Sequence, residues 1–308
     1  MEFLYFLERI RVPVLNEFML AITTLGDEIA FLVVALVTFW CVSKKIGYYI
    51  LAVGYIGTIG NQFMKLWFRV PRPWVLDPNF TILEQAREAA TGYSFPSGHT
   101  QSSIGTFGSL AYTTKNTVIR WLCIAVAILV PFSRMYVGVH TPKDVVVSAV
   151  FALILIFLLK PIVFNKKRDL MPLLLVAMAL LAVAFLCFVS FYGFPADIDP
   201  HNMHSGHKNA YTLLGALVGF LLVYVVDKRY LNFSTEAVWW AQILKAVIGL
   251  GLILGVKNGL KAPLEALFGE LPGRSVRYFL IVLVAGIVWP LSFRWFGKLG
   301  NRKEMENG

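Results

Sequence analysis

The stretch DVVVSAVFALILIFLLKPIVF, residues 144–164, decides the fold class. After Asp144 it carries no charged side chain until Lys160. The hydrocarbon core of a bilayer is about 30 Å thick, and a helix needs roughly 20 consecutive apolar residues to cross it. The stretch therefore predicts a transmembrane helix.

Similar apolar runs recur along the 308-residue chain, which is 57% hydrophobic and only 15% charged. A mean hydropathy of +0.68 is typical of a membrane protein and not of a soluble domain. We expect an all-α, polytopic membrane helical bundle with about nine transmembrane helices. Their approximate cores are 28–42, 47–66, 98–112, 118–137, 144–164, 170–191, 211–226, 238–256 and 276–293.

The first 26 residues mix apolar side chains such as Phe3 and Phe6 with charged ones such as Glu8 and Arg11. This pattern favours an N-terminal amphipathic helix that lies in the membrane interface. A frayed start of the first span is the alternative. Because the segment lacks a basic cluster followed by an apolar run, it predicts no cleavable signal peptide.

The net charge of +10 does not indicate a nucleic-acid partner, because the basic residues lie in short connections between apolar spans. These connections are 44–45, 115–120, 165–168, 227–229 and 294–303. The longer, alternating connections carry most of the acidic residues. By the positive-inside tendency, the short basic connections and the C-terminus face the cytoplasm.

Three segments place charged residues where hydropathy alone would not. They are KLWFRVPRP (65–73), YSFPSGH (93–99) and SRMYVGVHTPKD (133–144). No expected span separates the first segment from the second, and two spans separate the second from the third. All three segments therefore emerge on one side of the membrane, which we expect to be the outer side.

The first function that this cluster predicts is binding of a phosphate group. Lys65, Arg72 and Arg134 would be costly at a low-dielectric boundary without an anion. Arginine forks suit phosphate oxygens, and lysine adds a point charge. Ser97 and Gly98 open a helix, so their backbone N–H groups can donate to an anion at its positive end.

Two histidines add chemistry to the predicted phosphate site. Asp144 follows His140 by four residues, within reach of a carboxylate–imidazole hydrogen bond that suits a nucleophilic histidine. His99 is then available as the acid that protonates the leaving-group oxygen. Any one of these residues is more typical of an ordinary interfacial position, but the whole set on one side is not.

The three segments resemble the signature of the type 2 phosphatidic acid phosphatase superfamily, Lys-x6-Arg-Pro, Pro-Ser-Gly-His and Ser-Arg-x5-His-x3-Asp. The resemblance covers the chain up to about residue 164. It implies a six-helix catalytic bundle and a phosphohistidine at His140, with His99 as the acid and Asp144 as the orienting carboxylate. It also implies a phosphate held by Lys65, Arg72, Ser97, Gly98 and Arg134.

The second half of the chain has no comparable signature, and its extra spans resemble the layout of sphingosine-1-phosphate phosphatases. His201, His204 and His207 are expected in a solvated loop, with a metal site as the less favoured alternative. Lys245 is expected to extend to the cytoplasmic interface, with an ion pathway as the alternative. The three cysteines all lie in apolar runs and are interpreted as packing residues.

These observations predict a membrane lipid phosphatase that hydrolyses a phosphate monoester or diphosphate. The candidate lipids are phosphatidate, phosphatidylglycerol phosphate, a polyprenyl diphosphate and a sphingoid phosphate. A lipid phosphotransferase and a transporter are the alternatives. We expect no metal and no other cofactor, and the expected partners are the lipid substrate and membrane lipid.

We divide the chain into an interfacial helix (1–26), a catalytic membrane core (27–165) and transmembrane helices of unassigned role (166–308).

Overall fold

The computed structural model describes residues 1–299, and helices are the only regular secondary structure in this part of the chain. The expected all-α class is thus confirmed. Internal contacts divide the chain into two compact units. Unit 1 comprises Met1–Val34, Tyr49–Met171 and Phe188–Gly206, and unit 2 comprises Ala35–Tyr48, Pro172–Cys187 and the chain from His207 onward.

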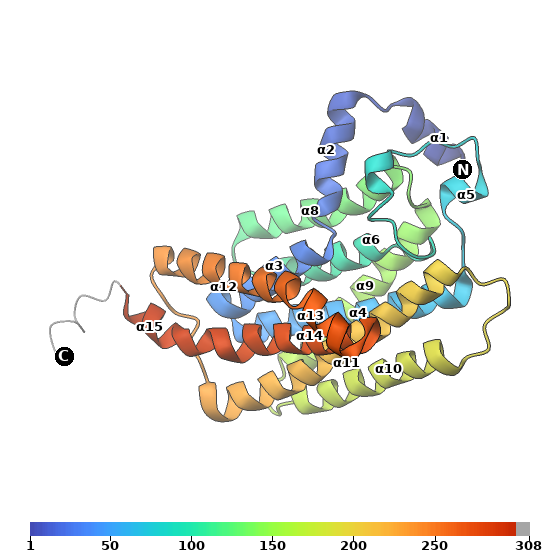
Figure 1. Ribbon diagram of the computed structural model, residues 1–308. Coiled ribbons are helices and arrows are strands. Elements are labelled where there is room, and N and C mark those ends of the chain that lie inside the picture. The colour runs from blue at the N-terminus through green and yellow to red at the C-terminus, as the bar shows by residue number, and fades with distance from the viewer. Residues whose placement is uncertain (300–308) are drawn as a thin grey trace, which may run out of the picture. The chain divides into compact units, whose positions relative to one another are not determined.

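Unit 1 contains all the residues of the three predicted motifs (Figure 1). Its own elements are α1 (Glu2–Arg9), α2 (Pro13–Thr24), α5 (Pro73–Leu76), η2 (Glu84–Ala86), α6 (Gly98–Ser103), η3 (Ile104–Gly108), α7 (Ser109–Thr113), α8 (Thr117–Tyr136) and α9 (Pro142–Val163). Four helices have residues in both units, namely α3 (Glu28–Val37), α4 (Lys44–Phe68), α10 (Met171–Phe191) and α11 (Pro200–Val226).

Unit 2 holds the C-terminal helices. Its own elements are η1 (Thr38–Val42), η4 (Asp227–Leu231), α12 (Trp239–Gly259), α13 (Lys261–Phe268), α14 (Glu270–Leu283), η5 (Val284–Val288), η6 (Trp289–Ser292) and α15 (Phe293–Lys298). A salt bridge of 3.1 Å joins Lys44 Nζ to Asp227 Oδ2 within this unit.

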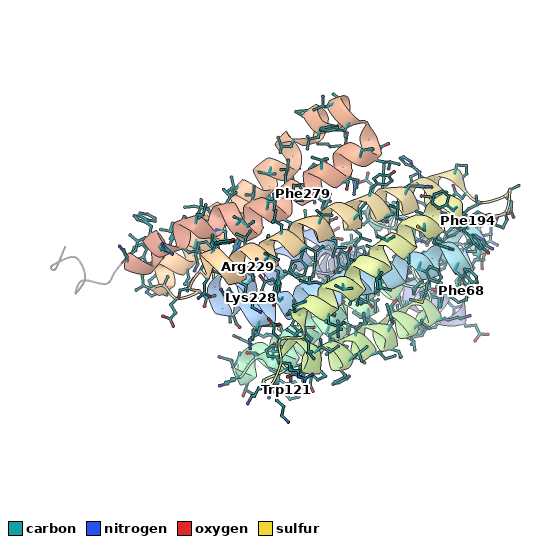
Figure 2. All side chains as sticks on the ribbon, turned by 90° about the horizontal axis from the view of Figure 1, so that it is seen from below. Phe68, Trp121, Phe194, Lys228, Arg229 and Phe279 are labelled. Carbon is teal, nitrogen blue, oxygen red and sulfur yellow. The ribbon has the colours of Figure 1, made fainter. Side chains whose placement is uncertain are left out.

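Six helices within residues 1–299 are long and apolar enough to cross a membrane, or seven if the bent pair α2 and α3–η1 is one span. The six are Thr117–Tyr136, Pro142–Val163, Met171–Phe191, Pro200–Leu231, Trp239–Phe268 and Glu270–Lys298. Large apolar side chains are exposed on these helices, Trp121 of α8 among them (Figure 2). Such exposure is typical of a surface that contacts lipid.

The expected count of about nine spans is not confirmed. If the bent pair counts as one span, two expected spans still fall short, namely 47–66 and 98–112. Helix α4 is long enough, but glycine, lysine, asparagine and glutamine lower its hydropathy. The continuous helix α6–η3–α7 runs only from Gly98 to Thr113, and its first turn is polar.

The N-terminal segment forms two helices and not the single one expected for residues 1–26. Pro13 begins α2, because proline fits the first position of a helix but not its interior. Leu4 and Leu7 of α1 are fully buried against protein, in clusters with Phe80 and Val137. The position of this segment in the membrane interface stays a prediction.

For the second half, one expectation is wrong and another is not tested. His201, His204 and His207 do not lie in a loop but on the first turns of α11, where Pro200 is the first residue and the Asp199 carboxylate accepts from His201 N at 2.8 Å. Lys245 is not exposed to lipid along α12, and its expected extension to the cytoplasmic interface stays a prediction. Its side chain is fully buried in unit 2, where Nζ donates to Thr235 O at 3.2 Å and lies 4.6 Å from the Phe293 ring centroid.

The three predicted motifs meet because helix ends converge in unit 1. Helix α4 ends at Phe68, and Arg69 takes a left-handed φ of 51° that turns the chain back. Helix α6 begins after its cap Ser97, and α9 begins after its cap Thr141. Helix α8 ends at Tyr136, just before Gly138 at φ 88°, a conformation that favours glycine.

Candidate active site

His140 lies in the tight connection between α8 and α9 and is only 1% exposed. The backbone of this connection is closed by one acceptor, since Val139 N and His140 N both donate to Arg134 O, at 3.1 and 3.3 Å. The imidazole is therefore held by a short, hydrogen-bonded loop between two helices. Such a side chain keeps one orientation, as a nucleophile requires.

The Asp144 carboxylate anchors one side of the His140 ring. His140 Nδ1 lies 3.4 Å from Asp144 Oδ2. The same oxygen accepts from Thr141 N at 2.8 Å, as part of the capping box that starts α9, and from Ser94 Oγ at 2.6 Å. Three donors thus converge on a buried carboxylate. With Nδ1–H facing Asp144, the lone pair of His140 is on Nε2.

Arg72 contacts that second nitrogen. Its Nη1 lies 2.9 Å from His140 Nε2. The other guanidinium hydrogen bonds go to backbone carbonyls, from Nε to Gly92 at 3.1 Å, from Nη1 to Val139 at 3.0 Å and from Nη2 to Thr91 at 2.7 Å. Arg72 therefore ties the connection before α6 to the loop that carries His140. Burial lowers the pKa of Arg72 to about 10, so the guanidinium stays charged at neutral pH.

The electrostatic surroundings favour a neutral His140. Burial lowers the pKa of His140 well below its usual value near 6.5, and the positive charges of Arg72, Arg134 and Lys65 lower it further. A neutral imidazole has a free lone pair, which is the form that attacks phosphorus.

Arg134 offers unused donors to a ligand. It is fully buried in the last turn of α8, and its Nη1 donates to Thr23 Oγ1 at 2.8 Å. Its Nε and Nη2 have no partner in the described part of the chain. A buried guanidinium with free donors is costly without an anion, so these two nitrogens can bind phosphate oxygens without breaking an existing hydrogen bond.

The other expected phosphate ligands differ in their availability. Lys65 is 5% exposed, and its Nζ donates to the carbonyl of Tyr93. The Ser97 backbone N–H donates to Asp144 O at 3.2 Å, and its hydroxyl accepts from Thr100 Oγ1 at 2.9 Å. Ser97 therefore links α6 to α9, and Gly98, as the first residue of α6, presents an N–H that the helix does not use.

His99, the second residue of α6, has a partner that sequence reasoning missed. Its Nε2 lies 2.7 Å from Asp27 Oδ1, in the turn between α2 and α3. Thr23, which binds Arg134, and Ser94, which binds Asp144, were missed as well. The position of Asp27 could have been predicted from the number of spans. Two expected spans separate it from the end of α4, so Asp27 and the motifs emerge on the same side of the membrane.

The structure thus brings the eight expected site residues into one region of unit 1. Within residues 1–299, no three His, Cys, Asp or Glu side chains form a group that could hold a metal ion. This holds for His201, His204 and His207 too. The charged groups available to a phosphate are those of Lys65, Arg72 and Arg134.

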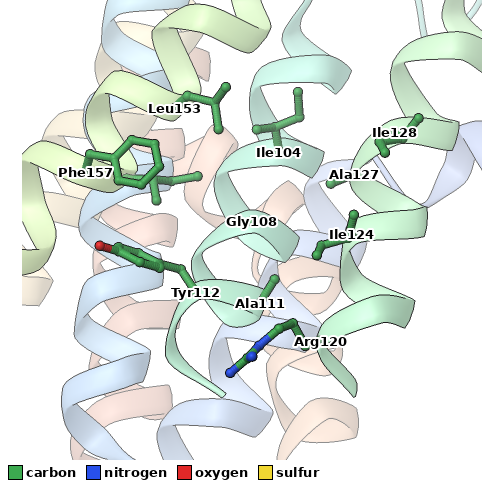
Figure 3. A pocket seen from close by; sticks show the side chains of 11 residues that line it. Ile104, Gly108, Ala111, Tyr112, Arg120, Ile124, Ala127, Ile128, Leu153 and Phe157 are labelled. Carbon is green, nitrogen blue, oxygen red and sulfur yellow. The ribbon is translucent and has the colours of Figure 1, made fainter. Parts of the chain in front are cut away.

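An apolar groove of about 660 Å³ lies further along the same helices, between α6–α7, α8 and α9. Figure 3 shows Ile104 and Leu153 at one end of it and Tyr112 and Arg120 at the other. Ile104 follows His99 by five residues, roughly 7–8 Å along a helix that rises 1.5 Å per residue. The groove therefore begins close to the His99 end of α6 and extends away from it.

Comparison with known proteins adds two family matches. The sequence model of the PAP2 superfamily matches residues 43–168. A second, described as PAP2 superfamily phosphatase, transmembrane extension, matches residues 211–302. No solved structure matches the chain significantly.

Three relatives illustrate the range of similar proteins. Undecaprenyl-diphosphatase BcrC of Bacillus subtilis is 35% identical over 38% of this chain and 57% of its own length. Phosphatidylglycerophosphatase B of Bacillus subtilis is 30% identical over 51% of this chain and 79% of its own length. Mouse sphingosine-1-phosphate phosphatase 1 is 24% identical over 83% of this chain and 62% of its own length. The match thus spans less than two thirds of the first and third relatives.

Proposed function

The chain belongs to the PAP2 superfamily, and from this premise we propose that it is a membrane phosphatase acting on a lipid phosphate monoester or diphosphate. It is an integral membrane protein, with apolar helices and a matched transmembrane extension. The observation that carries the proposal is the arrangement of His140. Its Nδ1 faces Asp144, its Nε2 faces Arg72, and the free donors of Arg134 are nearby.

The first half-reaction forms a phosphohistidine. His140 Nε2 attacks the phosphorus atom, the bond from phosphorus to the lipid or pyrophosphate oxygen breaks, and His99 gives a proton to that oxygen. The incoming phosphate oxygens take over the Arg72 Nη1 donor and fill the free donors of Arg134. Asp144 stabilises the positive charge that develops on the ring through Nδ1–H. Lys65, Arg72 and Arg134 balance the charge of the transferring phosphoryl group.

The second half-reaction releases phosphate. Water attacks the phosphohistidine, and neutral His99 takes the proton that the water loses. The nitrogen–phosphorus bond breaks, and neutral His140 and inorganic phosphate are regenerated. Both histidines end in their starting states, so the cycle consumes only the substrate and one water molecule.

The groove between α6–α7, α8 and α9 supports a substrate with a long hydrocarbon chain. It is lined mainly by apolar side chains and begins near His99, the residue that protonates the leaving oxygen in the mechanism that we propose. The relatives' names include an isoprenoid diphosphate, a phosphoglycerolipid and a sphingoid phosphate. These substrates share a terminal phosphate on a hydrophobic tail, which is the substrate class that we propose here.

We also propose the finer organisation. Helices α4 and α6–α7 cross the membrane as well, which brings the count to about nine, and residues 27–165 form the catalytic core. The first 26 residues lie at the membrane interface. The active site faces outward from a bacterial plasma membrane, and the C-terminus, which lies outside the described residues, is cytoplasmic.

The deciding experiment measures phosphate release by the purified protein in detergent. The substrate panel contains phosphatidate, phosphatidylglycerol phosphate, undecaprenyl diphosphate and sphingosine 1-phosphate. We expect turnover of at least one of them, abolished by His140→Ala and preserved by His201→Ala. A properly folded wild-type protein that releases phosphate from none of the four, even with added lipid acceptors, would refute the proposed activity.

A further inference from the structure

The turn between α2 and α3 forms a wall of the active site. The two helices meet at a bend of 54°, in the turn that contains Gly26 and Asp27. Gly26 packs directly on the first turn of α6, since a Cβ at this position would lie 2.9 Å from His99 Cβ and 3.1 Å from His99 O. A larger residue would push the turn off the helix. The turn is therefore held against His99 by close packing.

A second contact fixes the same turn to α8. Thr23 is 5% exposed at the end of α2, and its hydroxyl accepts from Arg134 Nη1 at 2.8 Å. The segment Thr23–Asp27 thus touches both the arginine and the histidine of two separate motifs. It precedes residue 43, where the match to the PAP2 superfamily begins.

Asp27 is the acidic partner of His99. Asp27 Oδ1 lies 2.7 Å from His99 Nε2, which is the distance of a close ion pair. The other charged or titratable groups that act on His99 are Arg134 from α8, Arg72 from the connection after α4, and His140. Burial and the two arginines lower the pKa of His99 to about 4, and the Asp27 carboxylate opposes this lowering.

We propose that Asp27 is a positioning residue for the general acid, orienting the His99 imidazole and favouring its protonated form. This inference rests on the proposed phosphatase function. It gives the site two histidine–aspartate pairs with different tasks. Asp144 is 1% exposed and holds a neutral nucleophile, while the Asp27 side chain is 40% exposed and supports a proton donor.

The pairing also assigns the nitrogen that transfers the proton. Asp27 Oδ1 faces Nε2, so we assign one proton of the imidazolium to that nitrogen, and Nδ1 of His99 is left for the substrate. In the first half-reaction the Nδ1–H bond breaks and an O–H bond forms on the leaving oxygen. The imidazole that remains is neutral and keeps the Nε2–H that faces Asp27. In the second half-reaction Nδ1 takes a proton from the attacking water.

The test is the pH profile of Asp27→Asn on two substrates. We expect the basic limb of kcat to move to lower pH by about one unit, because the neutral amide no longer favours the imidazolium. On a lipid monoester, kcat at neutral pH should fall by about tenfold or more, since general acid catalysis supplies roughly 10²–10⁴-fold. On an aryl phosphate, whose leaving group needs little protonation, the loss should be much smaller. Asp27→Glu should restore part of the lipid ester activity.

The matched control is Glu17→Gln, which removes an exposed acid from α2 without touching the site. Its profile should coincide with that of the wild type. An Asp27→Asn profile that coincides with the wild type, or an equal loss on both substrates at every pH, would overturn the proposal.

A second measurement does not depend on turnover. In protein labelled with ¹⁵N-histidine, the His99 resonance should titrate at lower pH in Asp27→Asn than in the wild type. An unchanged titration would refute the pairing. If the wild type released phosphate from no lipid while this titration moved as expected, the proposed function would fail and the His99–Asp27 pairing would stand.

Discussion

Arg72 Nη1 lies 2.9 Å from His140 Nε2, so an arginine covers the nitrogen that we assign as the nucleophile. The contact fixes the tautomer, because a guanidinium only donates and Nε2 must therefore accept. It also gives phosphate binding a defined first step. In the mechanism that we propose, an incoming phosphate oxygen replaces His140 as the acceptor of Nη1, which frees the lone pair while the positive charge stays in place.

Lysine is predicted not to replace arginine at position 72, in either activity or stability. Arg72→Lys keeps the charge but cannot bind Thr91, Gly92 and Val139 at once. We expect kcat/KM to fall by at least about 100-fold and the protein to lose about 2–4 kcal/mol of stability, because buried carbonyls lose their donors. Arg87→Lys, at an exposed arginine that pairs with Glu84, is the control and should change stability by less than about 0.5 kcal/mol. Kinetics and thermal melting in detergent check both, and wild-type kinetics in Arg72→Lys would contradict the role.

Replacement of His140 and replacement of His99 are predicted to change the activity on two substrates in different ways. His140→Ala should give neither a phosphoenzyme nor turnover with any substrate. His99→Ala should retain relatively more activity on an aryl phosphate than on a lipid ester, because an alkoxide needs the proton far more. Trapping with ³²P-labelled substrate distinguishes the variants. Turnover in His140→Ala, together with an equal loss on both substrates in His99→Ala, would reverse the assignment.

Stability is predicted to depend on the protonation of His140. Its pKa is lowered in the folded state, so between pH 6.5 and that lower value the unfolded chain binds a proton that the folded protein does not. Stability is therefore complete above pH 6.5 and declines as the pH falls through this window. We expect the melting temperature to drop less between pH 7 and 5 in His140→Asn than in the wild type. His201→Asn, at an exposed histidine, should follow the wild-type curve, and parallel curves for all three proteins would contradict the prediction.

Phosphatase activity is predicted to be insensitive to chelation of metal ions but sensitive to vanadate. Lys65, Arg72 and Arg134 supply the positive charge at the site, so activity should survive EDTA. Vanadate should inhibit, because its five-coordinate form resembles the transferring phosphoryl group. Phosphate release assayed with each reagent checks this. Complete loss on chelation, restored by Mg²⁺ or Zn²⁺, would refute the charge assignment.

The side of the membrane that the active site faces can be measured with two engineered cysteines. In a variant without Cys41, Cys123 and Cys187, Glu88→Cys is exposed in the connection before α6, and Lys115→Cys is exposed at the start of α8, opposite Arg134. An impermeant maleimide should label Glu88→Cys in intact cells and Lys115→Cys only after lysis. The reverse pattern would place the active site in the cytoplasm.

The parts predictable from sequence were those with a local pattern. The region around His140 and Asp144 could be predicted because motif spacing and membrane parity both constrain it. The all-α class could be predicted from apolar runs alone. Asp27 pairs with His99 across 72 residues, and no local spacing encodes such a contact.

The expectations for the second half came from applying hydropathy to single helices. The polar residues His201–His207 lowered the apolar score, although Asp199 and Pro200 are ordinary signals of a helix start. Lys245 was placed by the rule for a helix surrounded by lipid. In unit 2 its Nζ donates to the carbonyl of Thr235, in the connection before α12, and lies near the Phe293 ring, so it is covered by protein and not by lipid.

Thr23 and Asp27 precede the segment in which the family signature is found, and this bears on how genes of this type are annotated. A reading frame assigned to a start codon downstream of Asp27 would still encode every signature residue. Its product would nevertheless lack the hydroxyl that holds Arg134 and the carboxylate beside His99. On the role that we propose for Asp27, an intact signature is an insufficient criterion for an active gene product, and a survey of genomes should also ask whether a polar bend precedes the first matched helix.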